Sequence, residues 1–338
     1  MAACRYHPSA RLAGWRADGT IGGTAIATRR LVADIGGTNA RFALTDGSGR
    51  PTQDQKLSTS AYAGPVEAVC AYLGGREVDE AVFAMALPVD DDWVQLTNSP
   101  WAFSIEATRQ ALGLERLTII NDFSAQALAI PALLPNERLQ IGTGEPDRHA
   151  AIGVIGPGTG LGVGGLIHIG ETWHPIASEG GHISLAPRDE VEAAVKNHLS
   201  QRFGHVSNER VLSGPGLVNL ATALAEIAGE SLEIREPAEV SRRARDGDCR
   251  FCREALVRFS SLLGAAAGDL ALMLCARGGI YIGGGLVKRL GTLFDTEQFR
   301  AAFLAKGRFE EYLSEVPTYL VTRQDPGLLG AASLRTAA

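Results

Sequence analysis

The sequence predicts an α/β protein built from two lobes, and three observations lead to this expectation. At 338 residues the chain is longer than one compact core usually supports, so two lobes with a cleft between them are expected. The composition is 45% hydrophobic with 40 glycines, which fits many strand–turn–helix junctions. The third observation is a pair of glycine-tipped hairpins, each of which opens its own α/β segment.

The first hairpin spans residues 31–44 and combines a buried strand, a glycine turn and a second strand. Gly36 and Gly37 let the backbone approach a ligand closely, while Asp34, Thr38 and the turn amides supply an anion and several donors. This mixture suits a metal-bound phosphate. An ordinary hairpin is the alternative, because Gly-Gly between apolar runs is a common turn signal.

The second hairpin has the tip 156–162, which contains Gly158, Thr159 and Gly160 between apolar runs. Two such hairpins suggest a duplicated architecture in which both lobes present turns to a shared phosphate. Residues 160–165 also satisfy G-x-G-x-x-G, but a strand pattern follows where a dinucleotide fingerprint needs a helix. A Walker A loop is excluded because no lysine follows a glycine.

Between the hairpins, helix and strand patterns alternate as in a parallel sheet with crossovers. Helices are expected over 66–73, 103–112 and 124–134, and buried strands over 80–87 and 117–120. The last strand delivers Asn121 and Asp122 at its carboxyl end, where open α/β sheets bind their ligands. A simple cap on the following helix is the alternative role for this pair.

Three further polar positions lie in the second half of the chain. Glu179 and His182 flank two glycines in a polar loop expected between apolar strands, where a carboxylate can accept hydrogen bonds from two neighbouring hydroxyls; a solvated turn is the alternative. Glu209 precedes a helix that begins at Pro215. Gly284 lies in a triple-glycine turn on which a flat ring could rest, unless the glycines only serve strand–helix packing.

The remaining elements are helices. An amphipathic helix is expected from Asp189 to Gly204, and a long interior helix over 252–276. A closing helix begins near Asp325 and is expected to return to the first lobe. No apolar run is judged long enough to span a bilayer.

Charge and cysteine usage narrow the functional classes. The net charge of −6 argues against a general attraction to nucleic acid or to an anionic membrane. Five scattered cysteines fit a reducing cytoplasm, and the pair Cys249 and Cys252 is expected to serve helix packing rather than zinc binding. Residues 1–30 are rich in arginine and are expected to be a disordered leader or the product of an early start codon, with a transit peptide as the alternative.

Seven motifs in order resemble the bacterial glucokinase family, sugar kinases of the two-lobed actin-like (ribonuclease H-like) fold with a central cleft. The resemblance runs from about Leu31 to about Leu334. ROK-type sugar kinases share the plan but usually carry a cysteine-rich zinc motif, whereas residues 183–195 contain no cysteine. The motifs lie at 34–41, 97–104, 120–123, 158–162, 179–182, 209–216 and 325–330.

The resemblance implies a role for particular residues. Asp122 would be the base facing the sugar 6-hydroxyl, and Asp34 would hold Mg²⁺ through water. The implied sugar-binding residues are Asn121, Asp122, Gly160, Glu179, His182 and Glu209. The implied ATP-binding residues are Ala33, Asp34, Ile35, Gly36, Gly37, Thr38, Gly158, Thr159 and Gly284. The implied lobes are 31–132 with 324–338, and 133–323.

The activity implied is ATP-dependent phosphorylation of glucose at the 6-hydroxyl, the entry to glycolysis, in the cytoplasm. ATP and Mg²⁺ are the implied cofactors, with no zinc, no nucleic acid and no membrane partner; the resemblance allows a homodimer. Sugar binding is expected to draw the lobes together and exclude water. A sugar-responsive regulatory protein and a sugar-free actin-like ATPase are the alternatives. The first lacks a basic helix-turn-helix segment, and the second would have no use for Glu179, His182 and Glu209.

Overall fold

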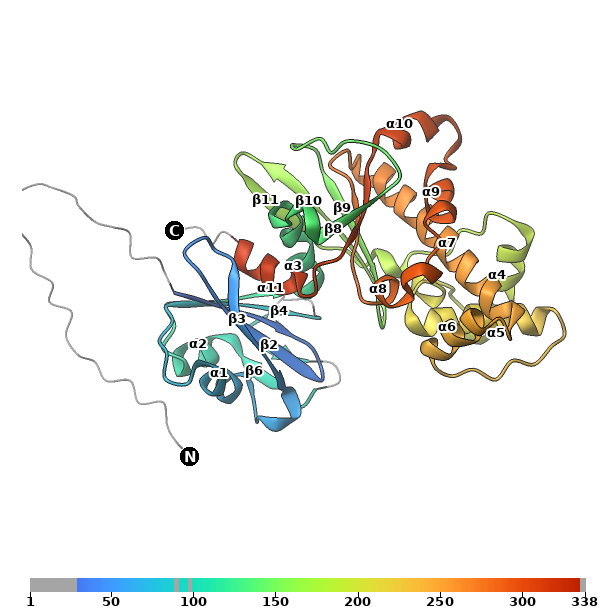
Figure 1. Cartoon of the computed structure of the whole chain (residues 1–338). Coiled ribbons are helices and arrows are strands. Elements are labelled where there is room, and N and C mark those ends of the chain that lie inside the picture. The colour runs from blue at the N-terminus through green and yellow to red at the C-terminus, as the bar shows by residue number, and fades with distance from the viewer. Residues whose placement is uncertain (1–28, 88–90, 97–98, 335–338) are drawn as a thin grey trace, which may run out of the picture. The chain divides into compact units, whose positions relative to one another are not determined.

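The computed structural model describes residues 29–87, 91–96 and 99–334 (Figure 1). They form two compact units: the first comprises the chain up to Ala125 together with the segment from Asp325, and the second runs from Gln126 to Gln324. Most of the expected leader and the motif residues Thr97 and Asn98 lie outside the described residues.

The first unit is built on a five-stranded sheet with the order β3-β2-β1-β4-β7. Strands β1, β2 and β3 pair antiparallel, and β1, β4 and β7 pair parallel. Helices α1 (Pro65–Leu73) and α2 (Ile105–Ala111) precede β4 and β7, as the predicted crossovers require. The strands are β1 (Arg30–Ile35), β2 (Asn39–Thr45), β3 (Pro51–Ser58), β4 (Glu80–Met85) and β7 (Arg116–Asn121), with a separate hairpin of β5 (Trp93–Gln95) and β6 (Ala102–Ser104).

Strand β1 contributes to hydrophobic clusters on both faces of this sheet. Leu31 and Ile35 pack in a cluster that includes Tyr72 of α1. Val32 points to the opposite face, because successive side chains of a strand alternate, and packs with Leu328 of α11 (Pro326–Ser333). The closing helix therefore packs in the first unit, as the sequence predicts.

The second unit contains a six-stranded sheet with the order β11-β10-β9-β12-β13-β8. Its strands are β8 (Arg138–Ile141), β9 (Ile152–Pro157), β10 (Leu161–Ile169), β11 (Thr172–Ile176), β12 (Ile280–Ile282) and β13 (Thr318–Val321). Helix α3 (Asp122–Ala129) contains the boundary between the units. The other helices are α4 (Glu190–Phe203), α5 (Gly214–Ile227), α6 (Pro237–Asp246), α7 (Arg250–Leu274), α8 (Leu286–Leu290), α9 (Thr296–Leu304) and α10 (Glu310–Glu315).

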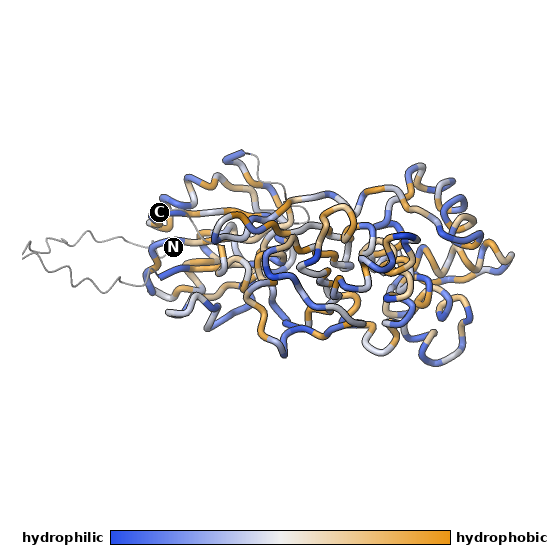
Figure 2. Tube along the Cα trace, turned by 90° about the horizontal axis from the view of Figure 1, so that it is seen from above, coloured by the Kyte–Doolittle hydropathy of each residue, from blue (hydrophilic) through white to orange (hydrophobic). Residues whose placement is uncertain are grey.

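Helix α7 is the central helix of the second unit and packs against α5, α6 and α9. In the described part of the chain it is the one helix long and apolar enough to cross a membrane, which corrects the expectation that no such run exists. However, 61% of its apolar window is buried inside the protein, which confirms the predicted interior helix. Along the trace, hydrophobic and hydrophilic residues alternate in short stretches (Figure 2).

The Cys249–Cys252 pair begins α7. Cys249 is the N-cap residue, and its Sγ accepts a hydrogen bond from the Cys252 amide at 3.3 Å. Burial, together with the neighbouring Cys249, raises the pKa of Cys252 to about 12, so the thiol is poorly reactive. Both side chains are buried, which confirms a packing role.

Two local predictions need correction. The second hairpin has a shorter tip than expected, because Gly156 and Gly162 pair across β9 and β10 and leave only residues 158–160 in the turn. The loop 178–182 follows β11 but precedes α4, with only an isolated bridge from Ser184 in between, so it does not connect two strands. Strand β10 does continue beyond its glycines, which confirms that this is no dinucleotide fingerprint.

Candidate active site

In the first unit, the predicted base and the predicted metal ligand lie at the carboxyl ends of parallel strands. Ile35 of β1 pairs with Met85 of β4, and Met85 pairs with Asn121 of β7, so these three residues share one row. Asp34 precedes this row and Asp122 follows it. The sheet register therefore places both carboxylates at the edge where open α/β sheets bind ligands.

Asn121 takes the capping role that the sequence left open for this pair. The Asn121 Oδ1 accepts hydrogen bonds from the amides of Phe123 and Ser124, at 2.9 and 3.1 Å, and so caps α3. Asp122 is the first residue of that helix and is half-buried. The capping interpretation is thus confirmed for Asn121, while its contact with a sugar stays a prediction.

Asp34 has an unusual electrostatic environment for a carboxylate. The pKa of Asp34 is raised from its ordinary 3.8 to about 6: burial is the largest cause, the charge of Asp122 acts in the same direction, and Arg41 opposes them. Arg41 is the direct partner of Asp34 across β1 and β2. The Asp34 carboxylate is therefore held close to the like charge of Asp122, and the positive charge of Arg41 offsets part of the cost of ionising it.

The N-terminal end of α11 approaches this carboxylate very closely. A Cβ atom at Gly327 would lie only 2.7 Å from Asp34 Oδ2, so this position accepts little beyond glycine without a shift. Arg41 also forms an ion pair with Asp325, the residue before α11. The sequence analysis includes Asp325 and Gly327 in a motif but assigns them no role, because only the tertiary structure brings them to Asp34.

The β1–β2 turn contains the other predicted phosphate-binding residues of this unit. Ala33 and Ile35 are fully buried, so only their backbone could face a ligand. The Gly36 amide donates to the Asn39 carbonyl at 2.9 Å and closes the turn. Thr38 is exposed at the tip.

In the second unit, the β9–β10 turn is joined to Glu209. The Leu161 amide donates to Glu209 Oε2 at 2.8 Å, and a Cβ atom at Gly160 would lie 2.5 Å from the same oxygen. One carboxylate oxygen of Glu209 is thus used by the backbone. The predicted sugar residues Gly160 and Glu209 are direct neighbours.

Glu179 and His182 are exposed on a 3₁₀ turn that packs on the start of β10. A Cβ atom at Gly181 would lie 2.0 Å from the Leu161 carbonyl oxygen, so the glycine is needed for this approach. The same turn packs beside the short 3₁₀ turn that carries Glu209. The structure therefore gathers the predicted sugar residues of the second unit in one place.

Gly284 lies against the strand that leads into the same hairpin tip. Its φ is +74°, and a Cβ atom there would lie 2.3 Å from the Pro157 carbonyl oxygen. Pro157 immediately precedes Gly158 and Thr159. The predicted nucleoside position and the predicted phosphate turn of this unit are therefore adjacent.

Asp34 is a suitable ligand for Mg²⁺. This ion usually keeps several waters and is held by one or two carboxylates together with substrate phosphates. A carboxylate that is half-buried beside a second carboxylate is stabilised by a divalent cation. Among the described residues, no group of three or more His, Cys, Asp or Glu side chains could form an all-protein metal site.

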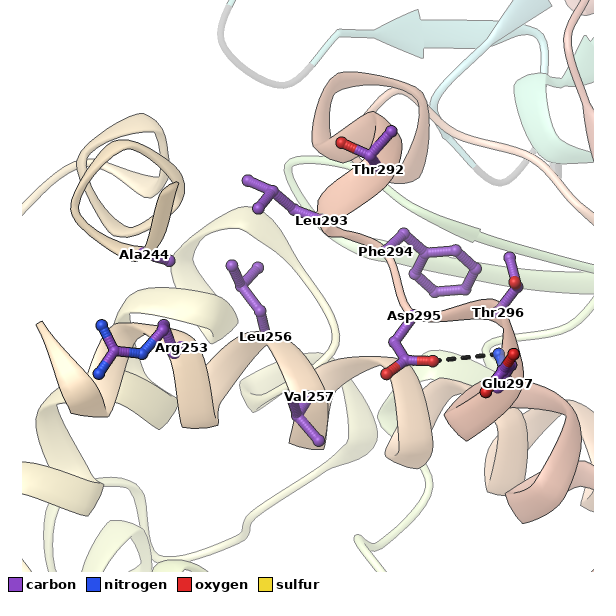
Figure 3. A pocket seen from close by; sticks show the side chains of 10 residues that line it. All are labelled: Ala244, Arg253, Leu256, Val257, Thr292, Leu293, Phe294, Asp295, Thr296 and Glu297. Carbon is purple, nitrogen blue, oxygen red and sulfur yellow. Dashed lines mark hydrogen bonds between the residues drawn. The ribbon is translucent and has the colours of Figure 1, made fainter. Parts of the chain in front are cut away.

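A separate pocket of about 470 Å³ lies between α6, α7 and the segment 292–297 (Figure 3). Asp295 caps α9 at its rim by accepting from the Glu297 amide at 3.1 Å. None of the predicted site residues lines this pocket, so it lends them no support.

Comparisons with known proteins identify relatives across nearly the whole chain. A family model described as glucokinase matches residues 31–338. The glucokinase of Aromatoleum aromaticum is 48% identical over 311 residues, which cover 90% of this chain and 93% of that protein. The crystal structure of a glucokinase from an Antarctic psychrotroph is 37% identical, with a TM-score of 0.85, and the match covers 90% of this chain and 98% of that one.

A more distant structure shares the fold alone. A ROK family glucokinase from Streptomyces griseus, solved in complex with glucose and AMPPNP, has a TM-score of 0.61 at 22% identity, over 90% of this chain and 98% of that one. The fold and the family match thus define a sugar kinase of the actin-like class. Within that class, the chain belongs to the glucokinase family.

Replacing Gly327 with alanine should disturb the surroundings of Asp34, because the new methyl group would overlap its carboxylate. We expect the free energy of unfolding in urea to fall by about 1–3 kcal/mol. Gly47→Ala is the matched control, since nothing lies within 4 Å of a Cβ atom there. Equal stability of both variants would contradict the close approach.

Asp34→Asn should stabilise the protein at high pH when Mg²⁺ is removed with a chelator. The folded-state pKa is raised, so the cost of ionising Asp34 is absent below 3.8, grows as the pH rises and is complete above about 6. Asparagine carries no such cost, and we expect a gain of roughly 1–3 kcal/mol at pH 8 that shrinks toward pH 4. Urea unfolding across pH measures it; a gain that does not change with pH would refute the assignment.

Glu209→Ala should destabilise the second unit, because the Leu161 amide loses its acceptor. The expected cost is about 1–2 kcal/mol in urea unfolding. Glu209→Gln keeps an acceptor oxygen and should remain close to the parent in stability. If the alanine variant were as stable as the glutamine variant, the hydrogen bond from the Leu161 amide to Glu209 would contribute nothing to the stability of the protein.

Proposed function

We propose that this protein transfers the γ-phosphoryl group of ATP to the 6-hydroxyl of glucose, giving glucose 6-phosphate and ADP. Membership of the glucokinase family across residues 31–338 carries the proposal. The placement of Asp122 at the carboxyl end of β7, beside Asp34, supports it from the chemistry.

In this proposal Asp122 is the general base. The sugar 6-oxygen forms a bond to the γ-phosphorus, the bond from that phosphorus to the bridging oxygen of ATP breaks, and the hydroxyl proton passes to the Asp122 carboxylate. A carboxylate within hydrogen-bond reach of a hydroxyl typically contributes about 10² to 10⁴ in rate. The remaining acceleration comes from alignment and from stabilisation of charge.

The second unit would bind the sugar through groups that accept and donate hydrogen bonds. Glu179 and His182 project from one turn, and Glu209 is held beside Gly160 by the Leu161 amide. Since one oxygen of Glu209 is used by the backbone, the other oxygen would accept hydrogen bonds from sugar hydroxyls. Glycine at 160 and 181 lets the ligand and the backbone approach closely.

The phosphates would be bound by backbone amides at two hairpin tips, around Thr38 in the first unit and Thr159 in the second. Asp34 would hold Mg²⁺ through water, and the ion, when bound, supplies positive charge beside the phosphates. Gly284 would lie beside the nucleoside. Burial of Asp34 beside Asp122 favours this assignment over a purely structural one.

The cellular setting is part of the proposal. We expect a cytoplasmic enzyme that needs no zinc, because residues 183–195 lack the cysteines of the ROK motif. No nucleic acid or membrane partner is expected from the net charge of −6. A homodimer is compatible with the proposed function.

The test is a coupled assay of sugar phosphorylation with ATP and Mg²⁺ on several hexoses. Asp122→Asn keeps the size of the side chain but removes the base, so kcat should fall about 10² to 10⁴-fold while glucose still binds. Glu115→Gln, which neutralises an exposed carboxylate of the same unit, serves as the control. Near-parental turnover of the Asp122→Asn variant would show that Asp122 is not the general base. A parent protein that is inactive on every hexose would refute the proposed kinase activity.

A further inference from the structure

Thr59 is a buried threonine that contacts the β1–β2 turn and has no role in the function proposed above. It follows β3 and is 1% exposed. Its hydroxyl donates to the Gly37 carbonyl at 2.7 Å, and its amide donates to the Thr38 carbonyl at 3.0 Å. One residue therefore anchors two successive carbonyl groups of the turn.

Anchoring a carbonyl also orients the amide of the next residue. A peptide group is planar and trans, so its N–H points away from its C=O. With the Gly37 and Thr38 carbonyls directed toward Thr59, the amides of Thr38 and Asn39 point to the other side of the turn. Successive amides that point the same way form an anion-binding concavity.

Trp101 holds Thr59 in place from the hydrophobic core. Its indole Nε1–H donates to the Thr59 and Tyr62 carbonyls, both at 3.1 Å, and the ring is fully buried. The position of the turn is therefore linked to a side chain that cannot move without disrupting the core.

The second unit shows the same arrangement at its own tip, with a different donor. The Gly158 carbonyl accepts a hydrogen bond from the Gly214 amide at 2.8 Å, at the first residue of α5. In both tips the anchored carbonyl belongs to a glycine that precedes a threonine. The Thr159 amide is therefore oriented away from its anchor, as the Thr38 amide is.

We propose that Thr59 is a positioning residue for nucleotide phosphates: its hydroxyl orients the Gly37–Thr38 peptide so that the Thr38 amide binds phosphate. This inference rests on the proposed function for the identity of the ligand. If the Thr59 hydroxyl had a purely structural role, its removal would lower the stability of the protein and leave its affinity for nucleotide unchanged.

The experiment compares Thr59→Val, which removes the hydroxyl but keeps the shape, with Thr59→Ser, which keeps the hydroxyl. We expect valine to weaken ADP binding, measured by calorimetry, and to raise the KM for ATP, each about tenfold. The KM for glucose should stay within about twofold, and serine should restore most of the ADP affinity. Trp101→Phe removes the indole donor and should weaken ADP binding in the same direction.

Thr318→Val is the matched control. Thr318 is fully buried in the second unit, and its hydroxyl also donates to a backbone carbonyl, that of Ile141, at 2.6 Å. This variant should lose stability comparably and keep its affinity for ADP. Equal ADP affinity of the Thr59→Val variant and the parent would overturn the inference, as would an equal loss in both valine variants.

The outcomes separate this inference from the proposed function. If the parent phosphorylates no hexose but binds ADP, and Thr59→Val weakens that binding, the kinase proposal fails and the positioning role stands. If the parent phosphorylates glucose and Thr59→Val changes only stability, the positioning role fails. A parent that does not bind ADP at all overturns the role of Thr59.

Discussion

The close approach of backbone to carboxylate is the constraint on which the predicted site residues of each unit depend. At Gly327 and at Gly160, a side chain as small as a methyl group would overlap a carboxylate oxygen, of Asp34 and of Glu209 respectively. Each carboxylate is therefore held against main chain, with little room to change its rotamer. A binding group held in this way loses less entropy when its ligand binds.

The carboxylates differ in how their charge is compensated. Glu209 is half-buried, and one of its oxygens accepts a hydrogen bond from the Leu161 amide. Asp34 is buried beside Asp122, and Arg41 offsets only part of this, so its surroundings disfavour ionisation. An unfavourable charge of this kind costs stability in the absence of ligand. It is a typical feature of a site that binds a cation.

The sequence predicts what is local and periodic. The crossovers before β4 and β7, the two hairpins and the long interior helix follow from runs of apolar residues and from glycine positions, and the structure contains them. The motifs that resemble the glucokinase family led to the correct fold class and activity. Strand β3, whose side chains are mostly exposed, has no hydrophobic pattern and was not predicted.

Tertiary neighbours of the site could not be predicted, because nothing local marks them. Thr59 follows a polar strand, and its importance comes from its distance to Gly37. Gly327 lies in the first turn of α11, and only the packing of this helix against β1 brings it to Asp34. The loop 178–182 was expected between strands because apolar residues flank it. The apolar residues that follow it belong to irregular chain before α4 and not to a strand.

The order of the chain has a consequence for how the first unit is completed. Its sheet is formed by residues before Ala125, but α11, which covers one face of the sheet and contacts Asp34, comes after the entire second unit. Val32, Ala43 and Val82 are buried only once α11 packs on them. Because contacts between such distant residues carry a large loop-closure entropy, they form late in folding. The surroundings of Asp34 are therefore complete only when α11 packs on this sheet, which ties the proposed metal ligand to the integrity of the first unit.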